Sequence, residues 1–198
     1  MKQDLQQLCT ITRRLVAAGL LDFSGGNVSV RCDEACFISP RFASSLLGWE
    51  LSPDDLVELP LGDDMDELPG DASREGWMHY ELYRLEHGFK AIVHTHQRDL
   101  LAFALAPTAL TLPAPLESLP SALIPLAEYA PPCTRRLAER VQRAISLHFP
   151  DSTQAAALME RHGAVVAAES LPSAASILAA LANAAYVQIA RGSLDSSP

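Results

Sequence analysis

The apolar run Ala91-Ile92-Val93-His94-Thr95-His96 ends in two histidines separated by one residue. Its β-branched residues are typical of a buried strand. Because successive side chains of a strand point to opposite faces, His94 and His96 project to the same side. This is the spacing that a metal ion needs, although a short His-x-His pattern is equally typical of surface histidines on a half-buried strand.

The segments before and after this strand alternate between helix and strand patterns. Helical spacing of apolar residues, or a capping residue, predicts helices at residues 2–20, 73–85, 100–105, 134–147 and 170–191. Apolar or alternating runs predict strands at residues 28–31, 35–38, 56–59, 155–159 and 164–168. Residues 107–132 hold seven of the 14 prolines and predict short strands and extended loops. The alternation predicts an α/β or α+β fold in which helices cover a mixed sheet.

The chain has 198 residues, 48% of them hydrophobic, which predicts one domain over residues 1–192 and a flexible tail at residues 193–198. Its net charge is −9, and no cluster of Lys and Arg offsets it, which disfavours nucleic acid and anionic membrane surfaces as partners. The N-terminal segment lacks the apolar stretch of a secretory signal, and no segment approaches the ~20 apolar residues of a membrane span. We therefore expect a cytoplasmic protein that binds neither nucleic acid nor membranes.

The four cysteines, Cys9, Cys32, Cys36 and Cys133, lack the spacing of a disulfide framework. Cys32 and Cys36 form a Cys-x3-Cys half-site, but no second Cys or His pair accompanies them. We expect reduced, packed thiols.

A third histidine, His162, lies in the polar turn Glu160-Arg161-His162-Gly163 between two apolar strand segments. Loops at strand ends often carry sites, and a glycine there permits close approach of the backbone. Three neutral imidazoles that leave one coordination position open form a catalytic zinc shell, whereas structural zinc sites favour thiolates. His94, His96 and His162 are therefore the candidate ligands of one Zn²⁺, or another divalent metal, per subunit.

Glu75 lies in the first turn of the helix expected from residue 73, where the helix dipole favours a carboxylate. That placement is ordinary for an acidic residue, so it fits either a catalytic role or simple helix stabilisation. His79, four residues further on, would either point the same way as Glu75 or be a hydrogen-bonded packing histidine.

Several polar residues are candidates for binding an anion. Gly26 and Asn27 precede a strand and predict either a tight turn or backbone N–H groups that converge on an anion. Ser39 and Arg41 follow the second strand, and Ser73 and Arg74 precede Glu75, so they offer hydroxyl and guanidinium groups to the same anion. We expect an anionic small-molecule substrate.

In their order along the chain, these motifs resemble the class II aldolase/adducin family from the first helix to the last. The matching segments are residues 24–31, 38–40, 73–75 with His79, 93–96, 127–129 with 134–137, and 161–163. The resemblance implies a three-layer α/β/α fold with a central, mainly antiparallel sheet. It also implies zinc on the three histidines and Glu75 beside the metal as the acid/base.

The resemblance further implies a phosphate pocket formed by Gly26, Asn27, Ser39 and Ser73, and a homotetramer with active sites at subunit interfaces. The implied activity is that of a lyase, either an aldolase or a decarboxylase. It would cleave a C–C bond in a sugar phosphate or related oxo acid through a metal-stabilised enediolate. Adducin-type heads keep the fold as binding or assembly modules, and an epimerase, dehydratase or iron enzyme on the same scaffold is a further alternative.

The chain departs from the family pattern at the expected anion pocket. It has Arg41-Phe42 where the family has a small hydroxyl residue and Gly, and Arg74 where the family has a second Ser. Two arginines there would either bind a carboxylate or phosphate in bidentate fashion or face solvent. No tyrosine of the chain matches the catalytic tyrosine of the family.

Overall fold

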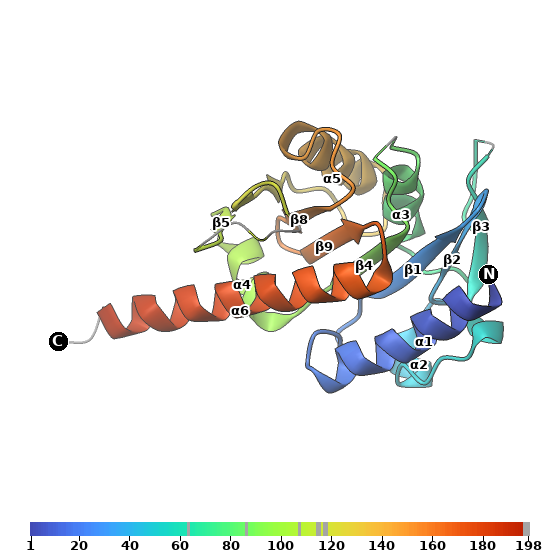
Figure 1. Ribbon diagram of the computed structural model, residues 1–198, viewed down its shortest axis with the longest axis horizontal. Coiled ribbons are helices and arrows are strands. Elements are labelled where there is room, and N and C mark those ends of the chain that lie inside the picture. Colours follow the sequence, from blue (N-terminus) through green and yellow to red (C-terminus); the bar gives the residue numbers. More distant parts are fainter. Residues whose placement is uncertain (63, 86, 107, 114–115, 117–118, 196–198) are drawn as a thin grey trace.

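The computed structural model describes residues 1–62, 64–85, 87–106, 108–113, 116 and 119–195 (Figure 1). The helices are α1 (Lys2–Ala17), α2 (Ala43–Leu47), α3 (Gly76–Tyr83), α4 (Arg98–Leu105), α5 (Arg135–His148) and α6 (Leu171–Asp195), with a short 3-10 turn η1 (Pro53–Asp55). The strands are β1 (Asn27–Cys32), β2 (Ala35–Ile38), β3 (Val57–Pro60), β4 (Ala91–Thr95), β5 (Leu110–Thr111), β6 (Leu123–Ile124), β7 (Leu126–Ala127), β8 (Ala155–Met159) and β9 (Gly163–Ala168).

Seven strands form one sheet in the order β3-β2-β1-β4-β9-β8-β7. Each neighbouring pair is antiparallel except β7 and β8, which run parallel. Helices α1, α4 and α6 pack together on one face of the sheet, and α3 packs against α5 on the other (Figure 1). The three-layer α/β/α fold with a mainly antiparallel sheet is confirmed.

Strand β4 occupies the middle of this sheet, between β1 and β9. Its apolar residues Ala91, Ile92 and Val93 are fully buried, as an apolar run without polar alternation requires. The pairing register sets Asn27 opposite His94 on one side, and Ala164 opposite Thr95 on the other. The turn before β1 and the turn between β8 and β9 therefore both lie at the end of β4 that carries the histidines.

Local sequence signals explain most element boundaries. The β1–β2 hairpin pairs Cys32 with Ala35, and Asp33 takes the positive φ of 54° that such a tight turn needs. Thr134 begins α5 by accepting a hydrogen bond from the Leu137 N–H at 3.2 Å. Helix α3 begins at Gly76 rather than at residue 73, because residues 73–75 form a turn whose side chains are used elsewhere.

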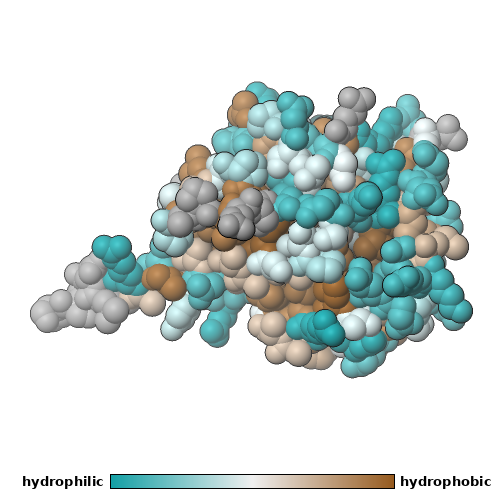
Figure 2. Space-filling view, viewed as in Figure 1, coloured by the Kyte–Doolittle hydropathy of each residue, from teal (hydrophilic) through white to brown (hydrophobic). Residues whose placement is uncertain are grey.

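The closing helix α6 differs from expectation in two respects. It continues to Asp195, so residues 193–195 are helical, while residues 196–198 of the expected tail lie outside the described residues. Among the described residues, one segment, Leu171–Gly192, has the length and composition of a membrane span, contrary to the expectation that none does. One side of α6 packs on β4 and β9, as a core helix does. In Figure 2, apolar residues gather where this helix crosses the molecule.

The described cysteines are all free, as expected, with Cys9 and Cys36 buried and Cys32 and Cys133 partly buried. Burial raises the pKa of Cys36 to about 12, so this thiol is protonated and inert at neutral pH.

Helix α5 offers a matched test of the core. Ile145 is fully buried, whereas Leu147, two residues away, is 72% exposed. Ile145→Ala is expected to lower the free energy of unfolding by about 2–5 kcal/mol, because it leaves a cavity under the helix. Leu147→Ala is expected to change it by no more than about 0.5 kcal/mol. Denaturant unfolding of both variants measures this, and equal losses would contradict the placement of α5.

Candidate active site

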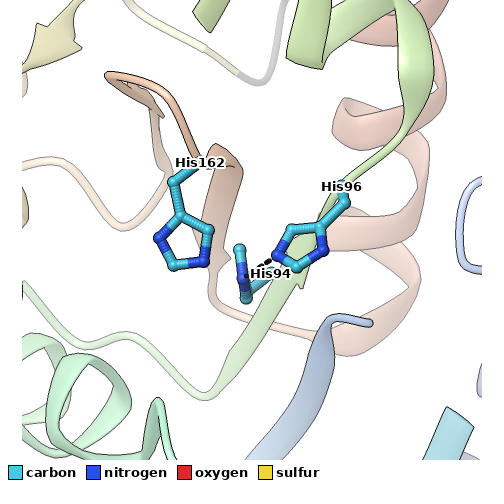
Figure 3. A group of neighbouring side chains, drawn as sticks. All are labelled: His94, His96 and His162. Atoms are coloured by element: carbon cyan, nitrogen blue, oxygen red, sulfur yellow. Dashed lines mark hydrogen bonds between the residues drawn. The ribbon is translucent and has the colours of Figure 1, made fainter. Parts of the chain in front are cut away.

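The three predicted metal ligands converge on one point. His94 and His96 come from the end of β4 and His162 from the turn before β9, and their rings face one another (Figure 3). One ligand nitrogen from each ring lies within 4.8 Å of those of the other two. His94 is 1% exposed, and His96 and His162 are partly buried.

Backbone carbonyls fix the orientation of two rings. The Nδ1–H of His94 donates to the Ala164 carbonyl at 3.0 Å, and the Nδ1–H of His96 donates to the Ser24 carbonyl at 3.0 Å. Each neutral ring then has an unprotonated Nε2, and these two nitrogens lie 3.1 Å apart. Two lone pairs at that separation repel unless a cation lies between them, and Nδ1–H bonded to a carbonyl is the usual support of a metal-bound histidine.

His162 completes the fit to a cation. Its Nδ1 is buried and has no hydrogen-bond partner among the described residues. Burial lowers the pKa of His162 to about 4, and burial together with the other two histidines lowers the pKa of His94 well below its usual value. Both rings are therefore neutral near pH 7, which is the protonation state that binds metal. The three histidines fit a divalent cation.

Glu75 lies beside this cluster as the sequence predicts. Its Oε1 is 3.4 Å from the Nε2 of His162, and the side chain is almost fully buried. Burial raises the pKa of Glu75, while the Cys133 N–H, 2.9 Å from Oε1, acts in the opposite direction. Glu75 is the N-cap residue of α3, but its side chain does not cap that helix. The carboxyl group is instead directed into the site.

The glycine turn before β1 closes against the histidines. Gly25 and Gly26 have φ values of 129° and 108°, which residues with a Cβ rarely adopt. A Cβ on Gly25 would lie 2.9 Å from the His96 ring, and a Cβ on Gly26 would lie 2.6 Å from the His94 carbonyl oxygen. The turn needs both glycines because only a bare backbone fits beside the metal ligands.

A pocket of about 530 Å³ opens onto the histidines and Glu75. The predicted anion-binding residues that line it are Gly26, Asn27, Arg41, Ser73 and Arg74. The prediction for Ser39 is not supported: it is fully buried, is not among the lining residues, and accepts a hydrogen bond from the Val28 N–H at 3.2 Å. Its hydroxyl group therefore ties β2 to β1.

The pocket carries positive charge. Arg41, Arg74 and Arg161 line it, and none of the three forms a salt bridge with a described residue. The Arg74 guanidinium lies 5.9 Å from the centre of the Phe42 ring, a cation–π distance. Three guanidinium groups around one pocket of an acidic protein favour an anionic ligand.

Cys133, Arg161 and Phe42 are among the lining residues that were not predicted as site residues. Cys133 reaches Glu75 across 58 positions, and a Pro-Pro-Cys sequence before a helix cap does not indicate such a contact. Arg161 lay in the turn recognised for His162, where its charge was a usable signal. Phe42 follows Arg41, and its 51% exposure is not readable from sequence.

A larger open groove, of about 1010 Å³, runs between α1 and α6. Its lining contains no histidine and no acidic residue, and its described side chains are mainly amide, hydroxyl and aliphatic groups. The smaller pocket holds the reactive groups and is therefore the candidate active site.

The fold agrees with that of the relatives of the chain. Residues 6–189 match the family model "Class II Aldolase and Adducin N-terminal domain", so the chain belongs to the class II aldolase/adducin family. It is 28% identical over 171 residues to the L-fuculose phosphate aldolase of Methanococcus vannielii, which covers 86% of this chain and 87% of that protein.

Solved structures show the same relationship. The crystal structure of L-fuculose-1-phosphate aldolase from Thermus thermophilus superposes with a TM-score of 0.81 and 26% identity, over 99% of this chain and 98% of that one. A second L-fuculose 1-phosphate aldolase superposes with a TM-score of 0.83 over 100% of this chain and 90% of that one, and at 22% identity it supports the fold.

The contact between Gly25 and His96 is testable. Gly25→Ala is expected to displace the His96 ring and lower zinc affinity by about 10- to 100-fold, the range typical for loss of support around a metal ligand. Competition with a chromophoric chelator measures it. Gly70→Ala is the control, since a Cβ there meets no atom within 4 Å. Wild-type affinity in Gly25→Ala would mean that the turn does not support the metal site.

Proposed function

We propose that this protein is a zinc-dependent aldolase that cleaves a C–C bond in a small sugar phosphate. The observation that carries the proposal is the convergence of three imidazoles and a buried carboxyl group on one pocket that is also lined by guanidinium groups. The names of two relatives, L-fuculose phosphate aldolase and 5-deoxy-D-ribulose 1-phosphate aldolase, support a phosphorylated ketose as the substrate class.

The chain's own residues supply binding and proton transfer in this proposal. The hydroxyl group of Ser73, the amide of Asn27 and the guanidinium groups of Arg41 and Arg74 bind the phosphate. A divalent cation held by the three histidines supplies a Lewis acid that draws electron density from the substrate carbonyl oxygen. Glu75 accepts the proton that the substrate releases during C–C cleavage and returns it to the product. A carboxyl group with a raised pKa suits this role, because it holds a proton nearer neutral pH than an exposed one.

The intact set of histidines also favours an enzyme over a binding or assembly module. A module without chemistry has no need for three buried or partly buried imidazoles directed at one point, or for a desolvated Glu75 beside them. Burying polar groups without partners costs free energy, so such a cluster persists where a ligand compensates for it.

Two substitutions separate metal binding from chemistry. His96→Ala is expected to lose stoichiometric zinc and activity together, because it removes a ligand. Glu75→Gln is expected to keep zinc but to lose at least about 100-fold in kcat, the contribution typical of a general acid/base. Metal analysis and a cleavage assay with phosphorylated ketoses measure both effects.

His148→Ala is the control for these variants, since His148 lies on α5 and its Nδ1 donates to the Ala144 carbonyl of the same helix. It should keep both zinc and activity. Wild-type protein without stoichiometric divalent metal would contradict the proposed function, and full activity in Glu75→Gln would contradict the role of that residue.

We also propose that the protein is a homotetramer with its active sites at subunit interfaces. Four large apolar side chains are exposed beside the pocket: Phe23, Phe42, Leu46 and Leu47. Phe23 and Phe42 line the pocket itself, and the two leucines lie on α2. A cluster of exposed apolar side chains is typical of an association surface, and this one adjoins the site.

Leu46→Glu tests the tetramer. The residue is 74% exposed in the single chain, so a charge there should not disturb the fold of one subunit. It is expected to convert tetramers to smaller species in light scattering and to reduce activity at the same time, because a buried unpaired charge opposes association. Leu147→Glu, 72% exposed on α5, is the control. A monomeric wild type with full activity would contradict an interface-built site.

A further inference from the structure

A continuous chain of buried hydrogen bonds runs behind the pocket. The Tyr83 hydroxyl lies 2.7 Å from Ser29 Oγ, and Ser29 Oγ lies 2.6 Å from His79 Nδ1. His79 Nε2 lies 2.5 Å from Asn27 Oδ1, and Asn27 Nδ2 lies 2.9 Å from Ser73 Oγ. Asn27 and Ser73 line the pocket, whereas the other three residues lie in the interior.

The fold brings these residues together through two regular periodicities. Asn27 and Ser29 are two residues apart on β1 and therefore project to the same face of the sheet. His79 and Tyr83 are four residues apart on α3 and therefore lie on the same side of the helix. The two β1 residues pack against the two α3 residues, and this packing leaves His79 and Ser29 with no exposed surface. His79 is thus a buried, hydrogen-bonded histidine.

The chain of hydrogen bonds has a preferred donor-to-acceptor direction. If Tyr83 donates to Ser29, then Ser29 donates to His79 Nδ1, His79 Nε2–H donates to Asn27 Oδ1, and Asn27 donates to Ser73. The hydrogen left over is that of the Ser73 hydroxyl, which faces the pocket. In the reverse direction the hydrogen of the Tyr83 hydroxyl would be left over, and Ser29 is the one hydrogen-bond partner of this hydroxyl among the described residues. Leaving a buried donor unpaired costs free energy, so the first direction is favoured.

We propose, on the basis of the proposed function, that His79 is a positioning residue of the phosphate pocket. In its Nε2–H tautomer it holds the Asn27 amide so that Ser73 presents its hydroxyl hydrogen to the substrate phosphate. Burial lowers the pKa of His79 to about 3, so the ring is neutral at physiological pH and a single tautomer is meaningful. The opposite tautomer would turn the Asn27 amide and leave Ser73 with only lone pairs for the ligand, which an anion disfavours.

The tautomer is testable by NMR of the zinc-loaded protein labelled with ¹⁵N-histidine. The His79 signals are identified by their absence in His79→Gln. The wild type is expected to show the Nε2–H tautomer, with Nδ1 unprotonated and hydrogen-bonded. Tyr83→Phe keeps the ring but removes the donor that favours this direction, so the Nδ1–H tautomer should become populated. A wild type in the Nδ1–H tautomer overturns the proposal.

The consequence for the ligand is tested with inorganic phosphate, titrated calorimetrically into zinc-loaded protein. Ser29→Ala removes the partner of His79 Nδ1 without touching the pocket, and it should raise the phosphate Kd by about two- to tenfold, as loss of one aligned hydrogen bond does. His148→Gln is the matched control and should leave the Kd unchanged. Zinc content and circular dichroism spectra equal to those of the wild type exclude a general loss of fold in the variants.

The outcomes distinguish failure of the proposed phosphate pocket from failure of the positioning role of His79. Wild-type protein that fails to bind phosphate contradicts the phosphate pocket, and with it the role of His79. Wild-type protein that binds phosphate, together with an unchanged Kd in Ser29→Ala, overturns only the positioning role. A weaker Kd in Ser29→Ala and a mixed tautomer in Tyr83→Phe support it.

Discussion

The pairing of β4 with β1 and β9 is the constraint on which the site depends. It fixes Asn27 opposite His94 and Ala164 opposite Thr95, so three segments distant in sequence end at one edge. A shift by one residue would send His94 and His96 to the other face, because strand side chains alternate. The buried residues Ile92 and Val93 oppose such a shift, since it would also exchange the faces on which they pack. The apolar core thus holds the three histidines in register.

Burial then decides the chemistry of the groups that the register brings together. Desolvation lowers the pKa of His94 and His162 and raises that of Glu75, so the cluster tends toward neutral groups in the absence of a cation. The surrounding pocket holds Arg41, Arg74 and Arg161 although the chain carries a net charge of −9. An anion entering this pocket is attracted by local positive charge, whereas the rest of the surface repels it.

The sequence predicted the elements well where periodicity is strong. Strands β2 and β8 lie at residues 35–38 and 155–159 as expected, and the helix expected from residue 134 is present as α5 with Thr134 as its N-cap. The convergence of His94, His96 and His162 was also predictable, because strand ends and their turns lie at sheet edges. Helix α2 was not predicted, since a five-residue element carries too little periodicity.

Side-chain partners were harder to predict than elements. Ser39 and Ser73 have the same chemistry in the sequence, yet one hydroxyl accepts the Val28 N–H and the other accepts from Asn27 at the pocket. The choice depends on which way each residue faces after the strands pair. The same holds for Cys133, whose N–H reaches Glu75 only because the loop before α5 folds over the start of α3. Such contacts are set by tertiary packing and not by local pattern.

Backbone strain marks the same pocket independently of its charges. Among the described residues, six that are not glycine have positive φ, and three of them, Phe42, Cys133 and Arg161, line the pocket. Their φ values of 64°, 63° and 62° place bulky side chains in the left-handed region, which costs about 1–2 kcal/mol each. Hydrogen bonds hold two of them there: the Cys133 N–H donates to the Glu75 carboxylate, and the Arg161 N–H donates to the Ala104 carbonyl.

Such a cost persists only where the surroundings fix the conformation, and it concentrates at sites where side chains must point in a particular direction. Here the three strained residues come from three different loops, and all three line one pocket. A pocket that binds no ligand would be lined more stably by residues in relaxed backbone conformations. The strain therefore supports the assignment of this pocket, and not the larger groove between α1 and α6, as the place where the substrate binds.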